Sequence, residues 1–128
     1  YCIHGLDADL IMLALGSPAR KFWILRDDMY DPKNDYFVIN IESTRKQLAE
    51  TMRWEEKEVK YYTSSGVEDF IFLCFMVGND FLPHVPSLEI IEGGIDCMID
   101  VYKNVGASYG HITSNIKGIV KFNKKALE

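Results

Sequence analysis

The sequence predicts an α/β protein, because apolar segments typical of strands alternate along it with segments typical of helices. Strand-like segments stand at residues 1–6, 22–25 and 36–41, and helix-like segments follow the first and the third. The composition is that of a folded protein, with 48% hydrophobic and 26% charged residues. The chain has 128 residues, so residues 1–128 are expected to form one domain or part of one.

The first predicted strand leads directly into a helix. Residues 1–6 are short and apolar, as in a buried strand, and the acidic turn Asp7-Ala8-Asp9 follows them. Residues 10–15 are apolar all round, which predicts a buried helix that stops at Gly16-Ser17-Pro18. Beyond the second strand, residues 26–35 contain Asp-Pro and Asn-Asp turn signals and are expected to form an exposed loop.

A polar helix is expected after the third strand. Ser43 or Thr44 is a suitable cap for its first turn, and the pattern runs through Met52. Residues 54–60 are highly charged, which is typical of a solvated face.

A core helix is predicted in the middle of the chain. Ser65-Gly66-Val67-Glu68 fits a capping box, and the apolar run behind it ends at Gly78, a suitable C-terminal glycine. Aromatic and β-branched residues in this run also suit a strand. The cap and the length of residues 65–77 favour the helix.

The last third of the chain is expected to hold two further helices and a tail. Ser87 is a suitable cap for a short helix that breaks at Gly93-Gly94. An amphipathic helix follows, with its apolar stripe at Ile95, Met98, Ile99 and Tyr102. The segment from Lys117 onward carries further lysines among apolar residues and is expected to be a solvated tail. These lysines are Lys121, Lys124 and Lys125.

Composition excludes several classes of protein. The net charge of -5, from 14 Lys+Arg and 19 Asp+Glu, argues against this chain being the main contact surface for a nucleic acid. Its three scattered cysteines predict reduced, buried thiols in an intracellular protein, and the absence of a CxxC pair excludes a cysteine-built zinc site. The longest apolar run, residues 70–77, is far shorter than the ~20 residues of a membrane span. Since the chain opens on a strand without Met, we interpret it as part of a longer polypeptide.

Asp7 and Asp9 are the first candidate site. They follow the first predicted strand, at the end of a strand where α/β folds bind ligands. Two adjacent carboxylates repel each other, and a bound Mg²⁺ or Mn²⁺ removes that penalty. The simpler interpretation, which the residues alone favour, is that one aspartate caps the helix while the other is solvated.

A second candidate lies after the predicted core helix. Gly78-Asn79-Asp80 suits a turn that delivers Asp80 to the edge of the core, although such a turn is also a common helix end. His84 stands between two prolines in a stiff loop, where a lone histidine is usually a packing residue. His4 lies three residues before Asp7, on the opposite face of a strand, and is expected to be a core or supporting residue. His111 has no neighbours in the sequence that would form a catalytic or metal-binding group with it.

The amino-acid sequence around these acids is typical of one family. Residues 5–11 and 72–84 closely resemble the 5′→3′ exoribonuclease family, and the match continues through residues 86–90. The resemblance is strongest in residues 1–15 and 69–90. The sequence of residues 86–90 resembles the nuclear branch of the family more than the cytoplasmic branch. The resemblance therefore implies that the protein is located in the nucleus, with the cytoplasm as the alternative.

This resemblance implies a fold and a chemistry. The family's catalytic domain has a PIN-like/flap-nuclease-like α/β fold, of which this chain would be a C-terminal portion rich in helix. Asp7, Asp9 and Asp80 match metal-binding catalytic acids, with Asn79 and His84 as supporting residues. Two Mg²⁺ or Mn²⁺ ions are implied in the complete domain. The other acids, and a basic pocket that selects a 5′-monophosphate, would belong to a more N-terminal segment.

The implied reaction is the stepwise release of nucleoside monophosphates from single-stranded RNA with a 5′-monophosphate. The chain alone is expected to be inactive and to require the remainder of the same catalytic domain as its partner. Free apolar area is expected to favour self-association, and no membrane partner is expected.

Three alternatives remain at this point. A structure-specific 5′ flap DNA endonuclease also uses scattered acids, although it would need a helix–loop–helix element after the last acid. A DxD glycosyltransferase would hold a nucleotide-sugar metal through Asp7 and Asp9, but this leaves residues 78–84 unexplained. In a non-catalytic scaffold domain, the acids would be ordinary helix caps.

Overall fold

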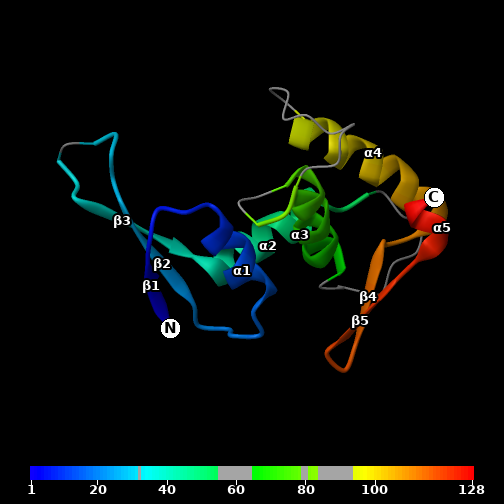
Figure 1. Cartoon of the computed structure of the whole chain (residues 1–128), viewed down its shortest axis with the longest axis horizontal. Helices are drawn as coiled ribbons and strands as arrows, with labels where there is room; N and C mark the ends of the chain where they lie inside the picture. Colours follow the sequence, from blue (N-terminus) through cyan, green and yellow to red (C-terminus); the bar gives the residue numbers. More distant parts are fainter. Residues whose placement is uncertain (32, 55–64, 79–80, 84–93) are drawn as a thin grey trace. The chain divides into compact units, whose positions relative to one another are not determined.

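A computed structural model describes residues 1–31, 33–54, 65–78, 81–83 and 94–128 (Figure 1). Both helices and strands are present, and a helix connects the parallel strands β1 and β2, which confirms the predicted α/β class. The elements in chain order are β1 (Cys2–His4), α1 (Asp9–Gly16), β2 (Trp23–Asp27), β3 (Tyr36–Asn40), α2 (Ile41–Thr51), α3 (Ser65–Val77), α4 (Gly94–Tyr109), β4 (Thr113–Ile116), β5 (Ile119–Phe122) and α5 (Lys124–Leu127). The chain divides into two compact units, residues 1–47 and 48–128.

The first unit is built on a three-stranded sheet in the order β1-β2-β3. β1 runs parallel to β2, and β3 runs antiparallel to it. Ile24 in the central strand is fully buried, between Ile3 and Ile39 on its neighbours. All three residues of β1 are exposed, so the predicted burial of this strand is wrong. The reason is that β1 is the edge strand of this sheet among the described residues.

β2 extends further than its apolar residues indicate. Arg26 and Asp27, which the sequence assigned to a loop, pair with Phe37 and Tyr36 of β3. Strand pairing is made by the backbone, so polar residues continue a strand when a partner lies beside them. The exposed loop therefore shrinks to the residues between Asp27 and Tyr36.

The predicted helix after the first strand is confirmed as α1. Its buried residues are Ala14 and Leu15, whereas Leu13 is 63% exposed, so the helix is buried on one side only. Arg45 donates to the carbonyl oxygens of Ala14, Leu15 and Ser17. The last carbonyls of a helix have no partner within it, and the Arg45 guanidinium supplies one.

α2 begins earlier than predicted, at Ile41 and not at Ser43 or Thr44. The Ser43 amide donates to Asn40 Oδ1 at 3.2 Å, so Asn40 caps the helix. Asparagine is as good a cap as serine. Because Ile41 is apolar, the sequence pattern assigned it to the preceding strand, although it is the first residue of the helix. The chain therefore passes from β3 into α2 without a loop.

The second unit packs around Met52, Tyr102 and Ile112, which are buried. α3 confirms the predicted core helix, and its apolar residues supply part of this core. Gly78 follows α3 with φ +96°, a conformation in which glycine avoids the strain of a side chain. Residues packed against the buried cluster are Trp54, Phe70, Phe72, Leu73, Ile99 and Ala126.

α4 confirms the predicted amphipathic helix. Tyr102 is buried and Ile99 packs on the core, but Ile95 at the start of the stripe is 44% exposed. The short helix expected from Ser87 lies outside the described residues.

Trp54 corrects the prediction of a solvated face at this position. Its ring lies 5.5 Å from that of Tyr102 and 4.6 Å from that of His111. A Cβ atom at Gly106 would stand 2.7 Å from the indole, so this glycine makes room for the tryptophan. Large aromatic side chains pack into cores even in charged segments. The remainder of that segment, residues 55–60, lies outside the described residues.

The predicted solvated tail is instead a hairpin followed by a short helix. β4 and β5 pair antiparallel, and Lys117 (φ +53°) and Gly118 (φ +82°) form the turn between them. Two consecutive positive φ angles match the right-handed twist of the strands, although Lys-Gly is a weak signal for such a turn. The lysines of this segment are exposed, but they stand on ordered elements.

The Asp69 carboxylate joins three parts of the second unit, and the sequence analysis missed it. Asp69 is fully buried near the start of α3. Its Oδ2 accepts hydrogen bonds from the Tyr102 hydroxyl (2.7 Å) and the Ile112 amide (2.9 Å). Its Oδ1 accepts them from the amide (2.7 Å) and the hydroxyl of Thr113. The carboxylate thereby ties α3 to α4 and to the start of β4.

His111, which has no candidate partner near it in the sequence, belongs to this network. Its Nδ1 lies 2.9 Å from the Tyr102 hydroxyl and 3.4 Å from Asp69 Oδ2. Burial by itself raises the pKa of Asp69, but hydrogen bonds from His111, Thr113, Tyr102 and the Ile112 amide outweigh it and hold the pKa below its ordinary value. Asp69 is therefore a charged carboxylate at neutral pH.

We expect Asp69→Asn to destabilise the second unit by about 3 kcal/mol, because an amide group then faces donors that the carboxylate oxygens had satisfied. Urea unfolding followed by circular dichroism measures this loss. Asp100→Asn, on the exposed face of α4, is the matched control and should change the free energy of unfolding by less than about 0.5 kcal/mol. Equal losses in the two variants would contradict a special role for Asp69.

The lowered pKa of Asp69 also predicts a pH dependence. The unfolded chain takes up the proton first, so the stabilisation by Asp69 is fully present above about pH 5 and is lost as the pH falls through its folded pKa. The gap in unfolding free energy between wild type and Asp69→Asn should narrow as urea titrations move from about pH 6 to about pH 3. A constant gap would show that the charge of Asp69 is unimportant.

Candidate functional site

The candidate acids of the first unit lie where β1 passes into α1, Asp7 in the connecting loop and Asp9 at the first residue of the helix. β1 ends at His4 and α1 begins at Asp9, so Asp7 and Asp9 stand where a strand of the sheet passes into a helix. Asp7 is exposed and Asp9 is half-buried. The predicted position at the carboxyl end of a strand is confirmed.

Asp7 orders this loop through its own side chain. Its Oδ1 accepts a hydrogen bond from the Asp9 amide at 2.9 Å, and its carbonyl accepts one from the Leu10 amide at 3.3 Å. This side-chain turn directly before α1 is a local structural role of the kind that the simpler interpretation assigns to an aspartate, although no side chain caps the helix at Ala8. A carboxylate has about four acceptor sites, so this hydrogen bond and metal binding by Asp7 are compatible.

Asp27 adds a further acid at the same end of the sheet, which the sequence analysis did not single out. Asp27 Oδ1 lies 2.9 Å from His4 Nε2, and the His4 ring packs edge-on against Tyr36. His4 is exposed on the sheet, so it is not a core residue, and the supporting role that was its other expectation stays a prediction. Because β1 ends at His4, strand alternation does not relate its direction to that of Asp7.

Within the described parts of the chain, no cluster of at least three His, Cys, Asp or Glu side chains is arranged to hold a metal ion. The predicted third acid, Asp80, lies outside those residues, as do Asn79 and His84. The chain before them is described up to Gly78, where α3 has ended. Phe81, directly after Asp80, is 84% exposed.

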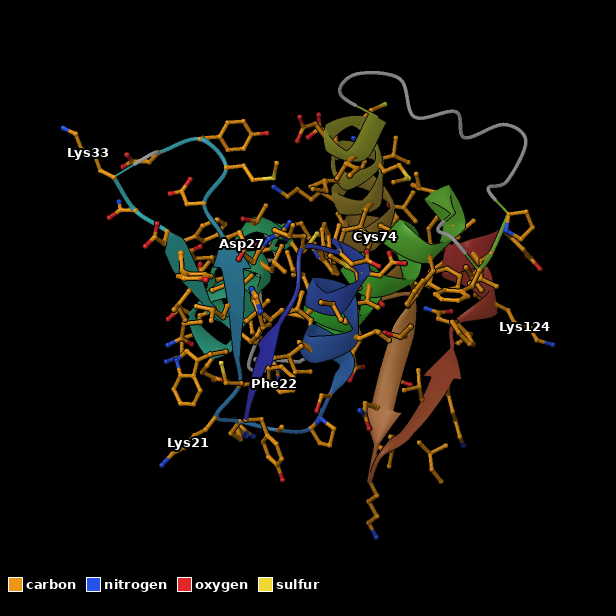
Figure 2. All side chains as sticks on the ribbon, turned by 60° about the vertical axis from the view of Figure 1, so that its left-hand side comes forward. Lys21, Phe22, Asp27, Lys33, Cys74 and Lys124 are labelled. Atoms are coloured by element: carbon orange, nitrogen blue, oxygen red, sulfur yellow. The ribbon has the colours of Figure 1, made fainter. Side chains whose placement is uncertain are left out.

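The cysteines differ from the prediction. All three are free thiols, but Cys2 and Cys97 are exposed, and only Cys74 in α3 is half-buried (Figure 2). Burial raises the pKa of the Cys74 thiol to about 11. Apolar neighbours in sequence therefore do not bury a residue on an edge strand or on the outer face of a helix. No helix among the described residues has the length and apolar character to cross a membrane.

Two family models match this chain. A model described as "Xrn1 helical domain" matches residues 60–126, more than half of the chain. A model described as "XRN 5'-3' exonuclease N-terminus" matches residues 1–28, which contain Asp7 and Asp9.

Three relatives with the name 5'-3' exoribonuclease 2 match over most of this chain. The protein of Yarrowia lipolytica is 37% identical over 113 residues, which cover 81% of this chain and 11% of the relative. That of Arabidopsis thaliana is 34% identical over 144 residues, 81% of this chain and 14% of the relative. That of Candida albicans is 33% identical over 128 residues, 80% and 13%.

The chain thus spans between 11% and 14% of the length of these relatives. The two family models and the named relatives point to the same family. The matched ranges include the residues around Asp7 and Gly78, on which the resemblance was based. The chain belongs to the 5′→3′ exoribonuclease family.

Proposed function

We propose that this chain forms part of a metal-dependent 5′→3′ exoribonuclease that degrades single-stranded RNA with a 5′-monophosphate to nucleoside monophosphates. The observation that carries the proposal is the pair of carboxylates between β1 and α1, within the residues matched by the exonuclease N-terminus model. The names of the relatives support the reaction class.

The proposed fold of the complete catalytic domain is PIN-like, with residues 1–128 as its C-terminal portion. A parallel strand pair with a helix between the strands, as in β1-α1-β2, is compatible with such a fold. Acids at the carboxyl ends of parallel strands are placed where α/β folds bind ligands.

The donor set fits a hard divalent cation. Asp7 and Asp9 offer carboxylate oxygens, the ligands that Mg²⁺ and Mn²⁺ prefer. We propose that Asp7, Asp9 and Asp80 hold the metal, with Asn79 and His84 as supporting residues and a second ion in the complete domain. A bound cation would activate water and stabilise the leaving 3′ oxygen. Among the described acids, the protein's own contribution is to hold Asp7 in the loop after β1 and Asp9 at the start of α1.

The chain alone should be inactive, since it carries only part of the acid cluster. Its partner in the complete enzyme would be the remainder of the same catalytic domain, and its location the nucleus. Exposed apolar residues on β3 favour self-association of the chain in isolation. These are Tyr36 (56% exposed), Phe37 (43%) and Val38 (57%).

The competing function is that of a non-catalytic scaffold, which the local hydrogen bond of the Asp7 side chain to the Asp9 amide favours. Metal binding separates the two proposals. We expect Mn²⁺ titration by calorimetry to show binding that Asp7→Asn and Asp80→Asn each weaken by at least about tenfold. Asp100→Asn, which removes an exposed carboxylate from α4, is the control and should leave the affinity unchanged. Unchanged affinity in all variants would favour the scaffold.

Substrate choice is tested in a full-length protein that contains this segment. With Mg²⁺, we expect release of nucleoside monophosphates from a 5′-monophosphorylated RNA, and a loss of at least about a hundredfold in rate for Asp80→Asn, with RNA binding retained. The isolated 128-residue chain should release none. Preferential cleavage of a 5′ DNA flap would contradict the exoribonuclease proposal and favour a flap endonuclease.

A further inference from the structure

The carboxyl end of β2 contacts the acidic loop through three consecutive residues. Figure 2 shows Asp27 at this end of the strand and Phe22 at the other end. Each of the three residues meets the chain between the end of β1 and Asp7. The contacts are Leu25 O with the Gly5 amide (3.0 Å), the Arg26 guanidinium with Leu6 O (2.5 Å), and Asp27 Oδ1 with His4 Nε2 (2.9 Å).

Arg26 makes the contact nearest to the candidate ligands. The Leu25 contact is between backbone atoms and forms whatever the side chain, and the Asp27 contact holds His4, three residues before Asp7. The Arg26 guanidinium instead holds the carbonyl of Leu6, the residue directly before Asp7. Hydrogen bonds from a charged donor are stronger than neutral ones, and this one, at an exposed position, is made to the residue directly before Asp7.

Packing gives the loop little other support. Leu6 is 44% exposed, and Asp7 and Ala8 are exposed as well. Because these residues are open to solvent, hydrogen bonds contribute to the position of the loop. Downstream of Leu6, they include the bond from the Asp9 amide to Asp7 and those that begin α1.

We propose that Arg26 is a positioning residue, which fixes the loop so that Asp7 and Asp9 present their carboxylates to a divalent cation. This inference rests on the proposed function for its metal, but not for the restraint on the loop. It gives a role to Arg26, which the sequence pattern assigned to the exposed loop of residues 26–35.

The charge of Arg26 makes the inference sharply testable. If the guanidinium acted only through its charge, its removal would strengthen cation binding, because a positive charge near a site repels a cation. If Arg26 positions the loop, its removal weakens cation binding. The two roles therefore predict opposite signs for the same substitution.

The first measurement is Mn²⁺ titration of the 128-residue chain by calorimetry, without RNA, so that contacts with phosphates do not contribute. We expect Arg26→Ala to weaken binding about tenfold or more, as residues that orient metal ligands do. Arg26→Lys keeps the charge and a donor and should lie between wild type and Arg26→Ala. Arg20→Ala is the matched control, because Arg20 is exposed and precedes β2, beside Lys21 at the opposite end of the strand (Figure 2).

The second measurement is amide hydrogen exchange by NMR, which does not depend on metal. In Arg26→Ala, the Gly5 and Asp9 amides should exchange faster, while the Trp23 amide, bonded to Tyr1 O at the far end of the strand pair, should keep its rate. A residue that merely stabilised the sheet would change both ends together. If Arg26→Ala fails to fold, Arg26→Lys carries the same comparison.

The outcomes separate this inference from the proposed function. Wild-type exchange at Gly5 and Asp9, or unchanged or tighter Mn²⁺ binding in Arg26→Ala, would overturn the positioning role. If the wild-type chain binds no Mn²⁺, the metal site of this chain fails, and the exchange rates still decide whether Arg26 fixes the loop.

Discussion

The second unit depends on one carboxylate that is withdrawn from water. A buried charge is strongly unfavourable unless hydrogen bonds replace its hydration, and Asp69 receives them from Tyr102 in α4 and from the backbone at Ile112 and Thr113. Each donor comes from a segment far from Asp69 in the chain. The charge is therefore satisfied only when α3, α4 and β4 meet in one arrangement, so this carboxylate specifies the packing of the unit as well as contributing to its stability.

The acids of the first unit face the opposite situation. Asp7 is exposed, and the hydrogen bond described for its side chain, from the Asp9 amide, is local. Water satisfies such a carboxylate at no cost, and it can exchange water for a cation. Burial thus separates an acid that organises a core from acids suited to a ligand, although both kinds stand near the start of a helix. Sequence position alone does not separate them, since Asp69 directly follows the expected capping residue Glu68.

This difference explains how much the sequence could predict. The strands and helices from β1 to α3, the amphipathic helix α4, the helix end at Gly78 and the position of Asp7 after β1 follow from local patterns, and the structure confirms them. The Asp69 network depends on Thr113, a residue 44 positions away, and no local pattern connects the two. The extension of β2 through Arg26 likewise depends on its partner strand β3. Hydrophobic periodicity reports the faces of single elements, whereas these features arise from the pairing of elements.

The pairing of β2 with its neighbours also determines how the loop that carries Asp7 is held. An acidic loop that binds a cation has to be held without neutralising its acids, because an arginine paired with a carboxylate competes with the metal. Binding of the guanidinium to a backbone carbonyl avoids this conflict, since the Leu6 oxygen is not a candidate ligand. Arg26 anchors the chain one residue before Asp7, and the carboxylate of Asp7 remains exposed. A strand that continues past its apolar residues can therefore place an arginine beside acids, where it anchors their loop. This arrangement is visible only once the pairing of β1, β2 and β3 is known.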